Sequence, residues 1–354
     1  MADPAIMEKL RTGLVIPAHP LALTEGRRLD ERRQRALTRY YLEAGAGGLA
    51  VGVHTTQFAI HRAQVGLYRP VLELAGETAG DCVASGRCPR PVMIAGLVGD
   101  TQQACAEAEL ARQLDYDVGL LSLTALRGQS VDAMLDHVAE VGRIMPVMGF
   151  YLQQAISGMT LPGEFWRRLF EIPAVVAVKI APFNRYQTLD VLEAVAMSGR
   201  SADIALYTGN DDNIVVDLLT KYEFQVDGGT VSLRIVGGLL GQWACWTRRA
   251  AEQLEQVHGI HQRGEAAPIP LLTLASAMTL ANKAVFDADH AFAGCIPGIS
   301  YVLMRQGLLG NTLTLDVAER LSPGQCERID GIMADYPHLT DDEFVRMRLD
   351  QWLS

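Results

Sequence analysis

Short apolar runs alternate with amphipathic segments through the first two thirds of the chain. Eight runs, mostly 23 to 34 residues apart, are predicted as strands: Leu14–Pro17, Gly48–His54, Val92–Val98, Val118–Leu123, Pro146–Leu152, Val175–Ala181, Ile204–Thr208 and Gly228–Leu233. The segments between them carry apolar residues at helical spacing, as in Asp132–Val141. Strands and helices alternating at this period are typical of βαβ units and a parallel sheet. Eight such units favour a closed (β/α)₈ TIM barrel, so we expect an α/β fold.

The strand pattern stops after about residue 236. Helices are predicted beyond it, at Leu239–His258, Pro270–Phe286, Cys295–Leu308 and Pro323–Met333. We therefore expect a barrel over residues 1–236 and a helical C-terminal extension, residues 237–354, packed on the barrel. An open nucleotide-binding sheet is disfavoured, because no GxGxxG turn follows the first strand.

Composition narrows the class of protein. The chain has 354 residues, of which 49% are hydrophobic and 20% charged, and this excludes a disordered chain. Its net charge of −10 argues against nucleic acid or an anionic membrane as a partner. The longest apolar stretches have about ten residues, half of what a membrane span needs. The N-terminus has no basic-then-apolar signal pattern, so we expect a cytoplasmic protein.

The six cysteines do not form a recognisable metal or disulfide pattern. None are spaced as CxxC, and no histidine lies two or three residues from any of them. Buried free thiols are the expected state of these residues. We expect neither a resident metal nor another cofactor.

One lysine lies in an unusual place. The chain has only four lysines among 31 basic residues, and Lys179 alone falls inside an apolar strand, Val175–Ala181. In a barrel, alternate side chains point into the lumen and reactive groups gather at the C-terminal ends of the strands. Burial lowers the pKa of a lysine from about 10.4, and a neutral amine can attack a ketone to form a Schiff base. The structural alternative is a lysine that extends to solvent or pairs with a carboxylate.

Three other strand ends carry polar candidates. Tyr151 ends strand five, 28 residues before Lys179, so we expect the two to meet in the barrel mouth, where a phenol can shuttle protons. Strand two ends in His54-Thr55-Thr56-Gln57, whose hydroxyls and turn amides suit a carboxylate. Strand seven is followed by Gly209 and Asp211, which either bind substrate hydroxyls or cap the next helix. Purely structural roles remain open for Tyr151, for the threonine pair and for His54.

These four strand ends together resemble the dihydrodipicolinate synthase / N-acetylneuraminate lyase family of class I aldolases, over roughly residues 12 to 290. The resemblance implies a barrel enzyme that is usually a homotetramer, so a homo-oligomer, dimer or tetramer, is expected. It implies that Lys179 forms a Schiff base with a 2-oxo acid such as pyruvate and that Tyr151 shuttles protons with Thr55 in its relay. By the same resemblance, Thr56 holds the substrate carboxylate and Asp211 binds hydroxyls of a sugar acid.

The chain departs from the family pattern at several positions. The family motif Gly-Thr-Thr-Gly-Glu reads His54-Thr55-Thr56-Gln57-Phe58 here, and the arginine expected five residues after the tyrosine is Ile156. A role in lysine biosynthesis is therefore not expected. His54 is a candidate for an added acid, base or substrate contact. Residues 295–354 extend beyond the usual end of the family.

Two other classes of function stay open at this stage. A barrel that uses a divalent metal to stabilise an enolate would draw ligands from His19, His54, Asp211 and Asp212, but would leave Lys179 unexplained. A non-catalytic barrel that binds a small acid is the other possibility, supported by the altered strand-two loop. The favoured hypothesis is a Schiff-base lyase, aldolase or dehydratase with a 2-oxo acid substrate.

Overall fold

The computed structural model describes residues 3–354, and the chain forms two compact units. The first combines the chain up to Leu14 with Val92–Leu239, and the second combines Val15–Pro91 with Leu240–Ser354. Among the described residues, no helix has the length and apolar character needed to cross a membrane.

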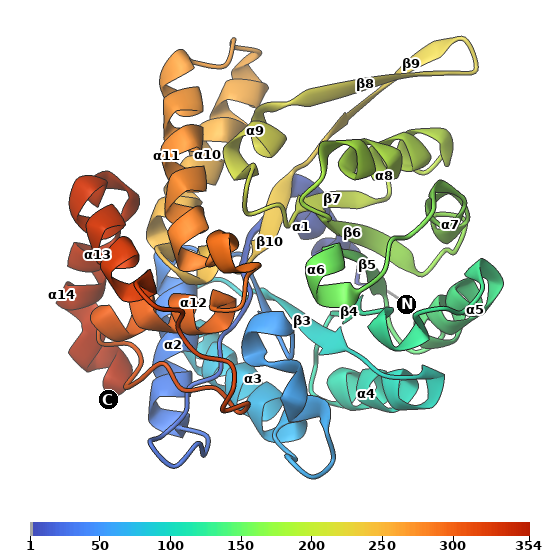
Figure 1. The fold of residues 1–354 in the computed structure, drawn as a ribbon. Coiled ribbons are helices and arrows are strands. Elements are labelled where there is room, and N and C mark those ends of the chain that lie inside the picture. The colour runs from blue at the N-terminus through green and yellow to red at the C-terminus, as the bar shows by residue number, and fades with distance from the viewer. Residues whose placement is uncertain (1–2) are drawn as a thin grey trace. The chain divides into compact units, whose positions relative to one another are not determined.

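The first unit is built on a parallel sheet. Its strands are β3 (Val92–Leu97), β4 (Val118–Leu121), β5 (Val147–Leu152), β6 (Val175–Ala181), β7 (Ala205–Thr208) and β10 (Gly237–Leu240), and they pair in this order. Four helices connect successive strands and lie along one side of them in Figure 1: α4 (Thr101–Gln113), α5 (Val131–Gly142), α7 (Gly163–Leu169) and α8 (Arg185–Met197). Nearly every strand residue is buried, as expected for a parallel sheet covered on both faces.

Side-chain caps fix where three of these helices begin. The carboxylate of Asp100 accepts a hydrogen bond from the amide of Gln103 at the start of α4, and Ser130 caps α5 in the same way. Asn184 accepts hydrogen bonds from two amides of the first turn of α8. Each cap satisfies helix amides that have no partner within the helix. The βα loops therefore end at defined residues.

The remaining helical elements of this unit are α1 (Pro4–Thr12), η3 (Thr124–Leu126), α6 (Gln154–Ser157) and α9 (Ile214–Leu219).

The second unit contains two parallel strands and most of the remaining helices. Strands β1 (Val15–Pro17) and β2 (Gly48–Val51) are joined by α2 (Glu31–Ala44), and β2 is followed by η1 (His54–Thr56), η2 (Phe58–His61) and α3 (Tyr68–Ala84). Just past β1, the amide of His19 donates to the carbonyl of Ala50, 2.8 Å away. The C-terminal elements are η4 (Gln242–Ala244), α10 (Thr247–Arg263), α11 (Ile269–Val285), η5 (Ala288–His290), α12 (Cys295–Arg305), α13 (Gln325–Asp335), η6 (Pro337–Leu339) and α14 (Asp342–Leu353).

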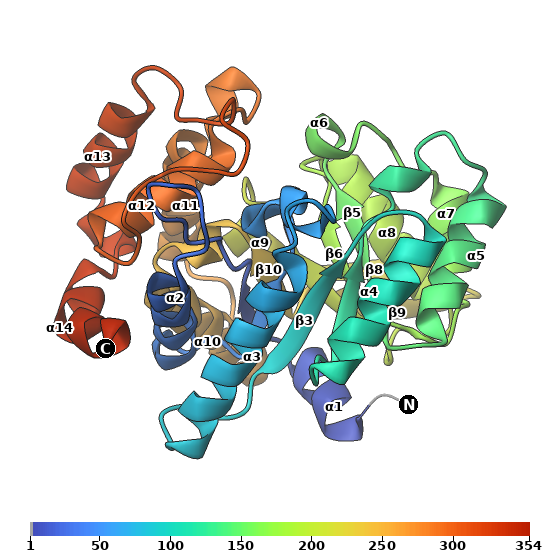
Figure 2. The same cartoon turned by 90° about the horizontal axis from the view of Figure 1, so that it is seen from below.

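The last helix of the chain packs on α2, the first helix of this unit (Figure 2). The rings of Tyr40 and Trp352 have centroids 5.4 Å apart, and both side chains are fully buried. The hydroxyl of Tyr40 donates to the buried carboxylate of Asp341, which also accepts from Gln306. Apolar packing and a hydrogen-bonded buried carboxylate thus hold the C-terminal end of the chain in this unit.

The eight parallel strands, in the order β1-β10-β7-β6-β5-β4-β3-β2, with helices between them and a helical C-terminal part, form a (β/α)₈ barrel. This confirms the predicted fold class. Seven of the eight predicted strand runs form the expected barrel strands.

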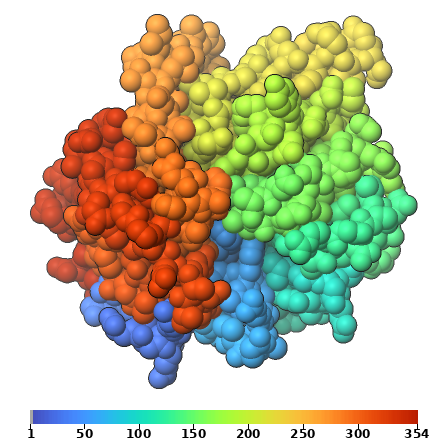
Figure 3. Space-filling model, in the orientation of Figure 1, coloured from blue at the N-terminus to red at the C-terminus, as the bar shows by residue number. Residues whose placement is uncertain are grey.

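The prediction for the eighth strand is wrong. The run Gly228–Leu233 lies in β9 (Gly229–Arg234), which pairs antiparallel with β8 (Lys221–Val226), whereas the eighth parallel strand is β10. The turn residues Asp227 and Gly228 both have positive φ, which is the Asp-Gly signature of a tight hairpin. This hairpin projects beyond α8 (Figure 3, yellow). Because the barrel strand β10 occupies Gly237–Leu240, the helix expected from Leu239 begins only at Thr247.

Candidate active site

Lys179 lies inside the sheet of the first unit, near the C-terminal end of β6. Its side chain is only 8% exposed, and its Nζ lies 4.4 Å from the centroid of the Phe150 ring. Lys179 is in register with Phe150 on β5 and with Tyr207 on β7. The hydroxyl of Tyr207 donates to the carbonyl of Leu10, so this phenol is already engaged. The amine is therefore buried, with the ring of Phe150 beside it.

Tyr151 lies on the other face of β5. Its ring contacts the buried Trp166 of α7, with centroids 4.9 Å apart, and burial raises the pKa of its phenol to about 12. Gly149 faces the same helix, since a Cβ there would lie 3.2 Å from Leu169. Successive strand residues point to opposite faces, so Phe150 is the β5 residue that lies beside Lys179. The expected meeting of Tyr151 with Lys179 is thus corrected. A role for Tyr151 as the proton shuttle stays a prediction.

One extra residue accounts for this difference. Val147 is in register with Val175, but the next pair is Met148 with Ala177, so Val176 has no partner on β5. If the first pairing continued without this bulge, the residue opposite Lys179 would be Tyr151. A β-bulge re-aims the side chains that follow it, and here it brings Phe150 to the lysine.

Gly209 leaves the space through which the Lys179 side chain passes. A Cβ at Gly209 would lie 2.7 Å from Cε of Lys179 and 2.7 Å from Cβ of Ala181, closer than real contacts allow. The amide of Gly209 donates to the carbonyl of Ile180 at 2.7 Å, so its backbone is tied to β6. The predicted strand-seven residue Gly209 and Lys179 are therefore brought together. Gly209 acts here through its lack of a side chain.

A buried carboxylate shapes the loop that carries Gly209 and Asp211. Asp217 is fully buried and accepts hydrogen bonds from Thr208 at 2.6 Å and from Asn210 at 3.0 Å. The guanidinium of Arg185 pairs with the same carboxylate. Asp211 lies on this loop and is itself buried, with 8% of its surface exposed. Asp217 was not singled out from the sequence. Its place on a predicted helix gave no sign that its carboxylate organises the loop after β7.

The threonine pair after β2 is held by the backbone of its own unit. Thr55 donates its hydroxyl to the carbonyl of Ala18 at 2.7 Å, and Thr56 donates to the carbonyl of His19 at 2.7 Å. The Thr56 hydroxyl also accepts from the amides of Gly52 and Val53. A hydroxyl has one proton and two lone pairs, so Thr56 has reached its full capacity. Neither hydroxyl has a proton left for a substrate carboxylate, and the predicted substrate roles of the pair stay predictions.

The histidines near this loop differ in their surroundings. His54 is half-buried, with its ring centroid 5.7 Å from that of Phe58. His19 is fully buried, its Nδ1 lies 2.9 Å from the Pro20 carbonyl and its Nε2 lies 2.9 Å from the Thr38 hydroxyl. Burial lowers the pKa of His19 to about 4, so its ring is neutral. Among residues 3–354, no three His, Cys, Asp or Glu side chains are placed to hold a metal ion together.

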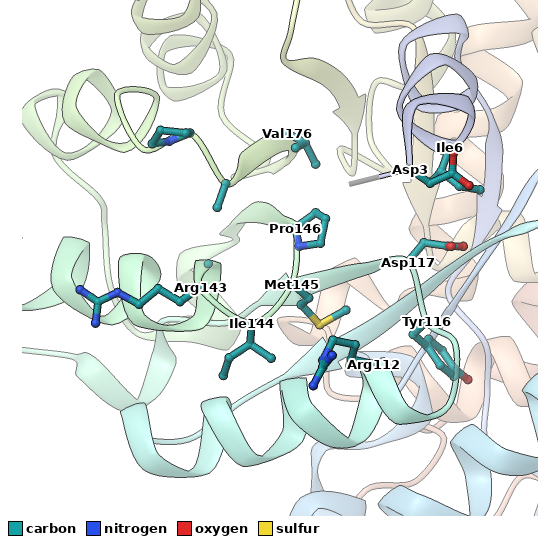
Figure 4. Close-up of a pocket in the computed structure, with 13 residues that line it drawn as sticks. Asp3, Ile6, Arg112, Tyr116, Asp117, Arg143, Ile144, Met145, Pro146 and Val176 are labelled. Carbon is teal, nitrogen blue, oxygen red and sulfur yellow. The ribbon is translucent and has the colours of Figure 1, made fainter. Parts of the chain in front are cut away.

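A cavity of about 460 Å³ opens at the other end of the same strands. Asp117, Pro146 and Ala174, which directly precede β4, β5 and β6, line it, and the bulge residue Val176 also borders it (Figure 4). In barrel enzymes the reacting groups lie at the C-terminal ends of the strands. This cavity therefore lies away from the face where Lys179 and Gly209 meet.

The fold recurs in solved structures of low sequence identity. A dihydrodipicolinate synthase from Oceanobacillus iheyensis has a TM-score of 0.73 and 13% identity, covering 94% of this chain and 99% of that one. A dihydrodipicolinate synthase from Acinetobacter baumannii, complexed with pyruvate, has a TM-score of 0.72 and 15% identity over 92% and 99%. An N-acetylneuraminate lyase from Fusobacterium nucleatum has a TM-score of 0.68 and 15% identity, also over 92% and 99%.

No protein-family model and no curated protein sequence matches the chain. The likeness therefore lies in the three-dimensional structure, and it extends over nearly the whole chain. The chain has the (β/α)₈ barrel fold of the dihydrodipicolinate synthase and N-acetylneuraminate lyase structures, which confirms, at the level of fold, the resemblance found in its strand ends.

Proposed function

We propose that the protein is a Schiff-base-forming lyase, aldolase or dehydratase that acts on a 2-oxo acid, with Lys179 as the residue that forms the imine. The observation that carries this proposal is a buried amine near the C-terminal end of a barrel strand, the face at which barrel enzymes react. One of the similar structures was determined with pyruvate bound, which supports a small 2-oxo acid as the substrate class.

The chemistry begins with the neutral amine of Lys179. Its lone pair forms a bond to the carbonyl carbon of the 2-oxo acid, and the carbonyl oxygen leaves as water with the two hydrogens of the amine. One further proton gives a positively charged imine. When a carbon–carbon bond of the substrate breaks, the hydroxyl group on the departing carbon gives up its proton and becomes a carbonyl. The electron pair of the broken bond moves toward the imine nitrogen and leaves a neutral enamine. Protonation of the enamine carbon and addition of water then release the product and restore the amine.

The remaining substrate contacts are proposed from strand-end position. Asp211 follows β7 on the loop that Asp217 organises, and we assign it to hydroxyl groups of the substrate. His54 follows β2 and is assigned to an acid, a base or a substrate contact. Thr55 and Thr56 are assigned to shaping the same loop, because their hydroxyl protons bond to backbone carbonyls. A homo-oligomer remains part of the proposal.

Reductive trapping tests the proposal. The protein is incubated with pyruvate and borohydride, and the modified peptide is located by mass spectrometry. We expect one adduct on Lys179 that is absent in Lys179→Ala. Lys283→Ala is the matched control, since Lys283 is half exposed and pairs with Asp289, and it should trap as the parent does.

A panel of 2-oxo acids extends the test beyond pyruvate. Absence of an adduct with every member of the panel, in protein that is folded by circular dichroism, would contradict the imine mechanism. Binding of the acids without an adduct would then favour a non-catalytic acid-binding barrel, and turnover abolished by a chelator would favour the metal-dependent alternative.

A further inference from the structure

The nitrogen that would react lies over the face of an aromatic ring. The distance from Lys179 Nζ to the centroid of Phe150 is 4.4 Å, and the two residues are direct neighbours across β5 and β6. Both are buried, with 6% of Phe150 and 8% of Lys179 exposed. The face of an aromatic ring carries partial negative charge and attracts cations, and the attraction is larger where water is excluded.

The lysine side chain is also confined from the opposite strand. Cε of Lys179 occupies the space beside Gly209, where a Cβ would lie 2.7 Å away. With β7 close on one side and the ring of β5 on the other, the end of the side chain has little freedom to leave the ring. The contact between Lys179 and Phe150 therefore follows from the strand register, and the bulge at Val176 sets that register.

We propose that Phe150 is a catalytic residue of the imine reaction, whose ring face stabilises the positive charge on the Lys179 nitrogen. This inference rests on the proposed function, because the charged species is the protonated imine. Forming that imine joins the lysine nitrogen to the substrate carbon, expels one water and retains one proton on nitrogen. The ring contact favours this charged form over the neutral imine, and it weakens when the electron pair of the breaking bond neutralises the nitrogen.

The ring supplies no proton in this reaction. A phenylalanine can neither donate nor accept a proton, so its contribution is electrostatic. The proton transfers must come from other groups or from the substrate itself. Phe150 accordingly has a role in holding the charged intermediate that is separate from proton shuttling.

Trapping with borohydride measures this directly, because the reagent reduces the protonated imine. In Phe150→Leu, which keeps an apolar side chain but loses the ring face, we expect the rate of trapping with pyruvate to fall about two- to thirty-fold. Phe150→Tyr keeps the ring face and should trap at least as fast as the parent. Phe165→Leu removes a buried ring from α7 and is the matched control, expected to trap as the parent does.

The outcomes separate the two proposals. Trapping in the parent with an equal rate in Phe150→Leu and Phe165→Leu would overturn the role of Phe150 and leave the imine mechanism standing. If the parent protein forms no adduct, the imine mechanism is overturned, and this inference with it. Thermal unfolding of each variant establishes that the trapped protein is folded, and loss of trapping in both leucine variants together would also count against a specific role for Phe150.

Discussion

Gly209 and Lys179 share one small volume of the barrel. A Cβ on Gly209 would lie 2.7 Å from Cε and 3.1 Å from Cγ of the lysine, and 2.7 Å from Cβ of Ala181. The first and last of these distances are below any normal contact between carbon atoms. The backbone of Gly209 has little room to retreat, because its amide bonds to the carbonyl of Ile180. The position of the amine therefore depends on the absence of a single methyl group.

Gly209→Ala should displace the lysine side chain and disturb the reaction more than the fold. Overpacking of a buried site costs about 1–3 kcal/mol of unfolding free energy, whereas a misplaced reactive group can lower a rate by roughly 100-fold. We expect trapping at Lys179 to fall by at least about tenfold while the protein still unfolds cooperatively in urea. Gly80→Ala is the control, because a Cβ there would meet no atom within 4 Å apart from its chain neighbours and the backbone of its own helix. Unchanged trapping in Gly209→Ala would show that the lysine position is not restricted in this way.

The hydrogen bonds of Thr56 predict a large difference in stability between two similar substitutions at this position. Thr56→Ser keeps a hydroxyl that can donate to His19 and accept from Gly52 and Val53, so its stability should stay within about 1 kcal/mol of the parent. Thr56→Val leaves three buried backbone groups without a partner, and each costs about 1–3 kcal/mol. We expect the valine variant to lose roughly 3 kcal/mol or more, measured by urea unfolding.

Thr55→Val provides the internal comparison. Thr55 makes one hydrogen bond, to the carbonyl of Ala18, so its loss should cost about 1–3 kcal/mol. Equal stability of Thr55→Val and Thr56→Val would contradict the difference in bonding. If Thr56→Val instead folded as stably as the parent and lost only substrate affinity, the threonine would serve the substrate and not the loop.

The fold could be predicted from the sequence because the strand signal is strong where strands are buried on both faces. Val175–Ala181 is apolar except for Lys179 and coincides with β6 in full. The eighth strand was missed because Gly237–Leu240 is short and half glycine, while the neighbouring hairpin carries a longer β-rich run. In that hairpin one face is apolar and the other polar, and its turn residues are Asp227-Gly228. These two features were the sequence signal that the run belongs to an antiparallel hairpin and not to the barrel.

The residues around the amine could be predicted only in part. The sequence singles out Lys179, and Gly209 was correctly expected at the end of the next strand. The spacing of 28 residues between Tyr151 and Lys179 predicts that they face each other, and this holds only for an uninterrupted register. Val176 breaks the register by one residue, and nothing in an apolar run marks which residue is the bulge. A one-residue shift moves a side chain to the other face of the sheet.

Gln57 joins the strand-two loop to a segment near the C-terminal end of the chain. Its side-chain oxygen accepts a hydrogen bond from the amide of Leu315 at 2.6 Å, and Asn311 donates from the same segment to the carbonyl of Leu23. Gln57→Ala removes the acceptor for the half-buried amide of Leu315, which should cost about 1 kcal/mol. We expect faster hydrogen exchange at the amides around Leu315, measured by mass spectrometry, with exchange in β6 unchanged.

The backbone of Gln57 adds a second expectation. Its φ is +69°, a conformation that favours glycine, so Gln57→Gly relieves strain as well as breaking the hydrogen bond. The glycine variant should therefore be more stable than the alanine variant by roughly 1 kcal/mol, although both exchange faster near Leu315. Slow exchange at Leu315 in both variants would mean that this segment is held by its other contacts.

His19 makes stability depend on pH in a defined window. Burial lowers its pKa to about 4, below the value of 6.5 expected in the unfolded chain. Above pH 6.5 neither state is protonated and the full stability is present; between pH 6.5 and 4 only the unfolded chain takes up the proton, so stability falls as the pH is lowered. The shift corresponds to roughly 3 kcal/mol lost by pH 4, at about 1.4 kcal/mol per unit.

His19→Asn tests this because asparagine cannot titrate. The variant should be less stable than the parent at pH 7, where it lacks the ring bonded to Pro20 and Thr38, but its stability should fall less between pH 6.5 and 4. Urea unfolding at several pH values measures the difference between the two proteins, which cancels the carboxyl groups common to both. His338→Asn, at an exposed position, should follow the parent curve. Parallel curves for the parent and His19→Asn would mean that the pKa of His19 is the same in the folded and unfolded chain. That result would contradict a His19 ring kept neutral by burial.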